Sequence, residues 1–163
     1  MSNHRKNRQW FSSKLQRFFW SREIAPLLLE LDCGWLDGGC YTCAKGLYRY
    51  LIISATIDPS MLSFSIVIDQ HQKAHHVVIG VQGATQVWFL DAKGVSSAQR
   101  LLHYWAREEH LTKPQIEACG DTDALESAIP SSDAIADRLA ECLLTILGPY
   151  DPAWLEGDPQ HTK

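Results

Sequence analysis

An apolar pattern at helical spacing, which begins directly after two glycines, is the feature that most constrains the fold of this chain. Residues 36–47 have the sequence LDGGCYTCAKGL. From Cys40 to Leu51 the apolar side chains recur at positions i, i+4, i+7, i+8 and i+11, which form one face of a helix. The pattern predicts a helix that begins at Cys40 and packs one face on a core, with a thiol in its first turn.

The segment after this helix alternates between apolar and polar residues, as half-buried strands do. Strands are predicted at residues 63–69, 76–81 and 86–91, and residues 82–85 join the last two as a hairpin. Flanking helices are expected at residues 8–20, at 23–31 (helical or extended), from Ser96 or Ser97 to about Glu109, and at 132–147, with a loop over 113–123. This order indicates an α+β fold with an antiparallel sheet.

Length and composition indicate one globular domain. The chain has 163 residues, of which 45% are hydrophobic, so it can bury about two-thirds of its unfolded surface. We expect no transmembrane segment, because no apolar run approaches roughly 18 residues. We also expect no secretory signal, because the apolar piece at residues 25–29 is short and no small-residue cleavage site follows it. Five scattered cysteines are not typical of a disulfide framework, so a cytoplasmic protein is expected. These cysteines are Cys33, Cys40, Cys43, Cys119 and Cys142.

We divide the chain into three parts: a basic aromatic segment at residues 1–22, a domain at 23–150 and a tail at 151–163. Charge distinguishes the first part. The first segment holds six basic and no acidic residues, whereas the remainder has 9 basic and 19 acidic residues. Five aromatic residues also lie in the first segment, and several share one helical face. The segment is expected either to pack on its own domain or to contact an acidic partner. Nucleic acid is not the expected partner.

A histidine and an aspartate in the predicted hairpin give the thiol chemical partners. If the strands pair symmetrically about the centre of residues 82–85, His76 lies opposite Asp91, and Cβ atoms of opposed residues are roughly 4.5–5.5 Å apart. His75 would then point to the other face of the sheet. A helix N-terminus lowers the pKa of a thiol, and a neighbouring imidazole can accept its proton. These residues therefore predict a catalytic triad of Cys40, His76 and Asp91.

The backbone around the thiol is expected to contribute to the same site. Gly38 and Gly39 permit a tight turn before the helix. With Tyr41 they form the turn and the first helical residues, where unpaired N–H groups can stabilise an oxyanion.

Three segments resemble the papain-like and transglutaminase-like cysteine-enzyme superfamily, especially small bacterial and phage-associated papain-fold proteins. These segments are GGCYTCAKGL, HHVVIGV and VWFLDAKGVSS, and the resemblance spans residues 36–109. It implies a central helix on an antiparallel sheet, with Cys40 as nucleophile, His76 as general base and acid, and Asp91 as the orienting residue. The implied activity is cysteine-dependent hydrolysis of an amide or isopeptide bond in a protein or peptide, through an acyl-thioester and without a cofactor.

Several alternatives remain open. Cys43 is the nucleophile if the second cysteine of CYTCA takes that role, and His75 replaces His76 if the register shifts by one residue. Cys40 and Cys43 could also begin a zinc site supplemented by Cys33 and a histidine, although no metal is expected. The protein could be an acyltransferase. It could also be a catalytically silent papain-fold binding protein of a mobile element, with an anti-defence, immunity or regulatory role.

Overall fold

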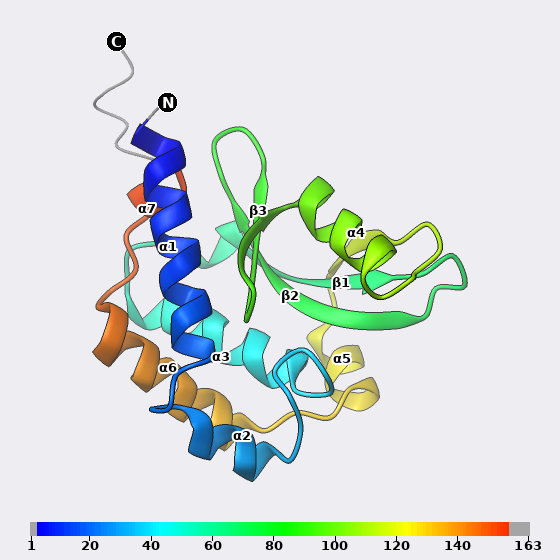
Figure 1. The fold of residues 1–163 in the computed structure, drawn as a ribbon, viewed down its shortest axis with the longest axis horizontal. Coiled ribbons are helices and arrows are strands. Elements are labelled where there is room, and N and C mark those ends of the chain that lie inside the picture. The colour runs from blue at the N-terminus through cyan, green and yellow to red at the C-terminus, as the bar shows by residue number, and fades with distance from the viewer. Residues whose placement is uncertain (1–2, 157–163) are drawn as a thin grey trace.

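The computed structural model describes residues 3–156, and this part of the chain forms seven α-helices and a five-stranded antiparallel sheet (Figure 1). The helices are α1 (Asn3–Phe19), α2 (Ala25–Leu31), α3 (Cys40–Ile53), α4 (Ala98–Arg107), α5 (Thr122–Ala128), α6 (Asp133–Leu147) and α7 (Ala153–Glu156). The strands are β1 (Leu62–Ile68), β2 (Ala74–Gln82), β3 (Val87–Asp91), β4 (Gly94–Ser97) and β5 (Gln115–Cys119), preceded by a 3-10 turn at Pro59–Met61. Their order in the sheet is β4-β3-β2-β1-β5.

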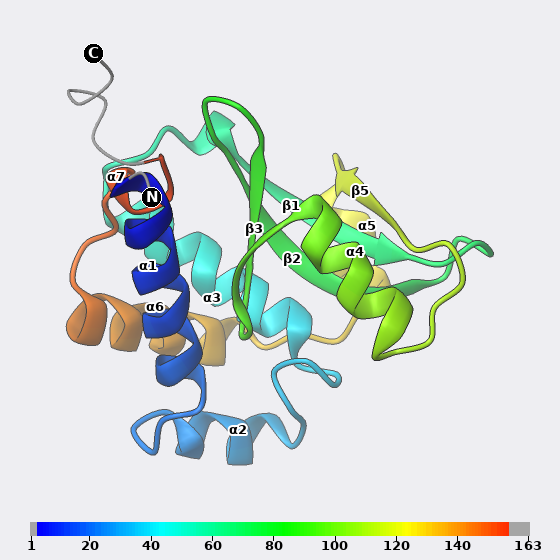
Figure 2. The same ribbon diagram turned by 45° about the horizontal axis from the view of Figure 1, so that its top comes forward.

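Helices cover both faces of the sheet, so its central strands are apolar on both sides. Val77 and Ile79 of β2 belong to the larger hydrophobic cluster, which includes side chains of α1, α3 and α6. Val78 points to the other face, where it packs in a smaller cluster with Leu101 and Trp105 of α4. Figures 1 and 2 show α3 and α4 on opposite sides of the sheet.

The predicted α+β class with an antiparallel sheet is confirmed, and so are the three predicted strands and a helix that begins at Cys40. Ser97 and Ser132 are the N-caps of α4 and α6, and Gly148 ends α6 with a φ of 77°. The predicted loop at residues 113–123 is wrong, because β5 lies there and pairs with β1. The segment that forms β5 is short and polar, so its own strand propensity is weak. It becomes a strand because it pairs with the otherwise unpaired edge of β1.

The aromatic N-terminal segment packs on its own domain. Phe11, Leu15 and Phe19 of α1 are fully buried in the larger cluster, and the Arg8 guanidinium lies 3.8 Å from the centre of the Trp88 ring. Trp10 remains 46% exposed. The contact with an acidic partner therefore stays a prediction, with the polar side of α1 as the available surface.

The chain after residue 150 is helical as far as it is described. Leu155 of α7 is buried, and Trp154 stacks on Trp10 and Phe11 of α1. The remainder of the predicted tail, residues 157–163, lies outside the described residues. Within residues 3–156, no helix combines the length and the apolar character that crossing a membrane requires.

The central helix α3 approaches α6 closely at Gly46. A Cβ atom at this position would lie 2.5 Å from Cδ2 and 3.1 Å from Cβ of the buried Leu139. Glycine costs about 1 kcal/mol relative to alanine inside a helix, so its presence here reflects space rather than helix propensity.

We expect Gly46→Ala to lower the free energy of unfolding by about 1–2 kcal/mol, because the clash with Leu139 outweighs the gain in helix propensity. Urea unfolding measures this change. In a Leu139→Ala background, where only the contact with Cβ of residue 139 remains, the loss should be much smaller. An equal loss in both backgrounds would show that contact with Leu139 is not the cause.

Candidate active site

A glycine turn places Cys40 at the first residue of α3. The Gly39 N–H donates to the Gly34 carbonyl at 2.9 Å, and Gly38 has a φ of 90°, which favours glycine. A Cβ atom at Gly39 would lie 2.7 Å from the Gly34 carbonyl oxygen. The Gly39 N–H therefore serves the turn, and the turn directs a thiol that is only 7% exposed toward the end of β2.

His76 of β2 and Asp91 of β3 form a buried hydrogen bond. The His76 Nε2–H donates to Oδ2 of Asp91 at 2.9 Å, and the two residues are 1% and 6% exposed. The other carboxylate oxygen of Asp91 accepts from the Lys93 N–H at 2.8 Å. Asp91 is thus held at both oxygens, and it fixes which ring nitrogen of His76 carries the proton.

The predicted register of β2 and β3 is wrong by two residues, but the expected contact between His76 and Asp91 is present. Ile79 pairs with Leu90 in the structure, because the turn is centred on residues 83–86 and closes with the Gly83 N–H on the Gln86 carbonyl. A shift of two residues keeps each side chain on the same face of a sheet. His76 and Asp91 therefore meet along a diagonal instead of directly across the hairpin.

The Cys40 thiol interacts with the His76 ring. Burial alone would raise the pKa of the thiol, but the neighbouring His76 ring and the N–H groups of Val77 and Tyr41 together lower it below its ordinary value. Burial likewise opposes protonation of His76, but Asp91 and Cys40 raise the pKa of the ring to about 9. Nδ1 of His76 is buried and makes no hydrogen bond within the described residues, so it is the ring atom left to accept the thiol proton.

Trp105 of α4 covers the imidazole, and sequence analysis did not identify it. The two ring centres are 4.8 Å apart with an interplanar angle of 33°, and Trp105 is itself buried. A stacked ring excludes water from the hydrogen bond between His76 and Asp91, which strengthens that bond. The only signal in the sequence was an apolar position on an amphipathic helix, and such a position does not indicate which residue it will cover.

The alternative residues lie close to the site but have other surroundings. Cys43 is buried, and its burial together with the nearby Asp91 and Cys40 raises its pKa well above the ordinary value, so it stays protonated. His75 bonds to Asp69 at 2.9 Å instead of to the thiol. Across residues 3–156, no three His, Cys, Asp or Glu side chains are grouped as metal ligands.

A pocket of about 520 Å³ opens beside the thiol. Cys40 and His76 form part of its wall, and most of the other lining groups are apolar. The apolar groups include Gly38, Ile66, Val77, Leu125, Ile129 and Pro130, and His75 and Cys119 also line the pocket. The wall opposite the sheet comes from α5 and the chain that follows it, a region where no helix was predicted.

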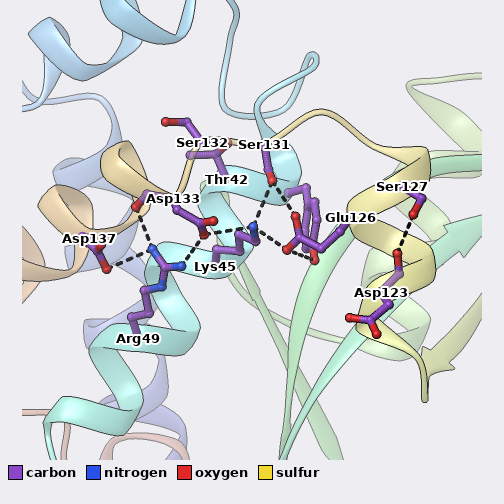
Figure 3. Close-up of polar contacts among 11 residues, drawn as sticks. Thr42, Lys45, Arg49, Asp123, Glu126, Ser127, Ser131, Ser132, Asp133 and Asp137 are labelled. Atoms are coloured by element: carbon purple, nitrogen blue, oxygen red, sulfur yellow. Dashed lines mark hydrogen bonds and ion pairs between the residues drawn. The ribbon is translucent and has the colours of Figure 1, made fainter.

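A buried lysine attaches this wall to α3, as Figure 3 shows. The Lys45 ammonium lies 2.5 Å from Glu126 of α5 and 3.0 Å from Asp133 of α6, and it donates to the Ser131 hydroxyl at 3.0 Å. The Tyr41 hydroxyl also donates to Glu126 at 2.9 Å. Lys45 and Tyr41 are one helical turn apart, so one segment of α3 holds both the thiol and the wall facing it.

Cys40, His76 and Asp91 form a continuous series of polar groups from the pocket to the interior. A thiol, an imidazole and a carboxylate in this order can act as nucleophile, proton carrier and orienting group. No protein-family model matches the chain, and neither does any curated protein or solved structure.

The pKa shifts predict how alkylation of Cys40 by iodoacetamide depends on pH. Because the pKa of Cys40 is lowered, the midpoint should lie below about 8.5, the ordinary value for a thiol. In His76→Ala burial is opposed only by the N–H groups of Val77 and Tyr41, so the midpoint should move to higher pH than in the wild type. Peptide-resolved mass spectrometry across about pH 5 to 10 follows each cysteine separately. Equal midpoints in both proteins would contradict the coupling between thiol and imidazole.

Lys45→Met should loosen the pocket wall without leaving a buried charge alone, since Glu126 and Asp133 are both largely exposed. We expect amide hydrogen exchange over residues 122–128 to become about tenfold faster or more. Lys113→Met, at an exposed site away from this network, is the matched control and should leave the exchange unchanged. Unchanged protection of α5 in Lys45→Met would contradict this role.

Proposed function

We propose that this chain is a cysteine-dependent hydrolase of amide or isopeptide bonds in a protein or peptide, with a papain-like core. The observation that carries the proposal is the buried series of Cys40, His76 and Asp91, which ends at a pocket. The helix α3 packed on an antiparallel sheet supports the papain-like core. The five cysteines are free thiols, which fits a reducing cytoplasm as the place of action.

Acylation begins when the Cys40 thiolate attacks the carbonyl carbon of the substrate. A carbon–sulfur bond forms, and the electron pair of the carbonyl π bond moves to the oxygen. When this pair returns, the carbon–nitrogen bond breaks, and the His76 imidazolium gives its proton to the leaving amine. The products of this half-reaction are the free amine and an acyl-thioester on Cys40.

Deacylation uses the same groups with water as the acceptor. The neutral His76 ring takes a proton from water while the water oxygen attacks the thioester carbon. The carbon–sulfur bond then breaks, which releases the acid and restores the pair of thiolate and imidazolium. An acyltransferase would differ only in using an amine or another acceptor in place of water.

The backbone at the start of α3 provides a site for the oxyanion. The Cys40 N–H is the first of the helix, where no intrahelical partner exists, and it donates to no acceptor within residues 3–156. A negative oxygen beside it would also be stabilised by the positive end of the helix dipole. We therefore place the oxyanion at the N–H of Cys40.

Acylation by p-nitrophenyl acetate tests the proposal, with nitrophenolate release and intact mass as readouts. Cys40→Ala should abolish adduct formation with the fold intact. Asp91→Asn should slow acylation by about 10²- to 10⁴-fold, because it no longer holds the imidazole in the required state. His75→Ala should slow acylation far less than His76→Ala, since the His75 ring lines the pocket but bonds to Asp69.

Two results would overturn the assignment of residues. If Cys43→Ala were inactive and Cys40→Ala active, the nucleophile would lie one helical turn further along. If His75→Ala and His76→Ala exchanged phenotypes, the general base would be the neighbouring histidine. A wild-type Cys40 that reacts no faster than an ordinary thiol would favour the catalytically silent binding protein.

A further inference from the structure

We propose that the pocket beside Cys40 binds an uncharged, apolar side chain on the acyl side of the substrate. This inference rests on the proposed function, because it assigns the part of the substrate that lies next to the reacting carbonyl. Both Cys40 and His76 belong to the pocket wall, so a carbonyl in position for attack brings its neighbouring group into this space.

The lining of the pocket favours an apolar occupant. Among the described residues that form it, none is a lysine, an arginine, an aspartate or a glutamate. Its volume of about 520 Å³ is within the roughly 300–1,000 Å³ of ligand sites in proteins. Ile66, Val77 and Leu125 offer aliphatic surface that an apolar side chain would remove from water.

Two acidic residues next to the pocket lining are already paired. The Glu126 carboxylate of α5 is bound by Lys45 and Tyr41, and Asp69 is bound by His75. A charged substrate side chain that entered the pocket would lose its water without gaining a free partner of opposite charge, which is costly. Selectivity against charged side chains therefore follows from the lining and from these pairings.

Covalent probes that place a side chain next to the reacting carbonyl test this inference. N-acetylated amino-acid chloromethyl ketones of leucine, phenylalanine, aspartate and lysine differ mainly in that side chain, and the Cys40 thiolate displaces their chloride. We expect the leucine and phenylalanine probes to label Cys40 about 10- to 100-fold faster than the aspartate and lysine probes. Iodoacetamide, which carries no side chain, reports the reactivity of the thiol alone.

A substitution that fills the pocket provides a second test of the inference. Ala128 lines the pocket on the exposed side of α5, so Ala128→Trp can occupy it without disturbing the core. It should slow the leucine and phenylalanine probes about tenfold or more and leave the iodoacetamide rate nearly unchanged. Ala134→Trp, at an exposed position of α6 outside the pocket lining, is the matched control and should change neither rate.

The outcomes separate the two proposals. If iodoacetamide labels Cys40 no faster than an ordinary thiol, the proposed function fails, and the substrate inference fails with it. If Cys40 is highly reactive but the charged probes react as fast as the apolar ones, only the inference about the pocket fails. That inference also fails if Ala128→Trp slows iodoacetamide as much as the leucine probe, because the pocket would then be only an access route.

Discussion

The helix α3 is buried on almost every side, and this burial determines how the elements around it are arranged. Ten of its residues are buried, among them Lys45, which has to be paired because an isolated charge in the interior is costly. Glu126 and Asp133 provide that pairing, and the chain between α5 and α6 is thereby drawn over the start of the helix. The pairing that the buried Lys45 ammonium requires thus determines where the pocket wall lies.

The same burial governs the chemistry at the first turn of α3. In an apolar environment the neutral thiol and the neutral imidazole would be favoured, since desolvation opposes both charged forms. Proximity of the two groups and the Asp91 carboxylate reverse this preference, because each charge is stabilised by an opposite one. Trp105 keeps water away from this pairing, so stacking on α4 and hydrogen bonding in the hairpin act together.

The sequence predicted which side chains meet at the candidate site better than it predicted the geometry that joins them. Side chains alternate between the two faces of a strand, so a shift of two residues in the pairing keeps His76 and Asp91 on the same face of the sheet. The predicted pairing was wrong by two residues, and the prediction that these two side chains meet was therefore unaffected. The start of α3 was predictable because glycines and helical spacing are local signals. By contrast, Trp105 and Lys45 act through contacts with residues distant in the chain, and nothing in their neighbourhood indicates those partners. The strand β5 escaped prediction for the same reason.

Different interactions hold the catalytic groups and the pocket wall, and this separation has a physical consequence. Cys40, His76 and Asp91 are fixed by the packing of α3, β2, β3 and α4, whereas α5 is a seven-residue helix. Of its side chains only Leu125 is buried, and Lys45 and Tyr41 attach it to α3. A short helix with few buried contacts opens locally at a lower free energy than the core does. The wall is therefore expected to open more readily than the core, while the thiol, the imidazole and the carboxylate keep their arrangement.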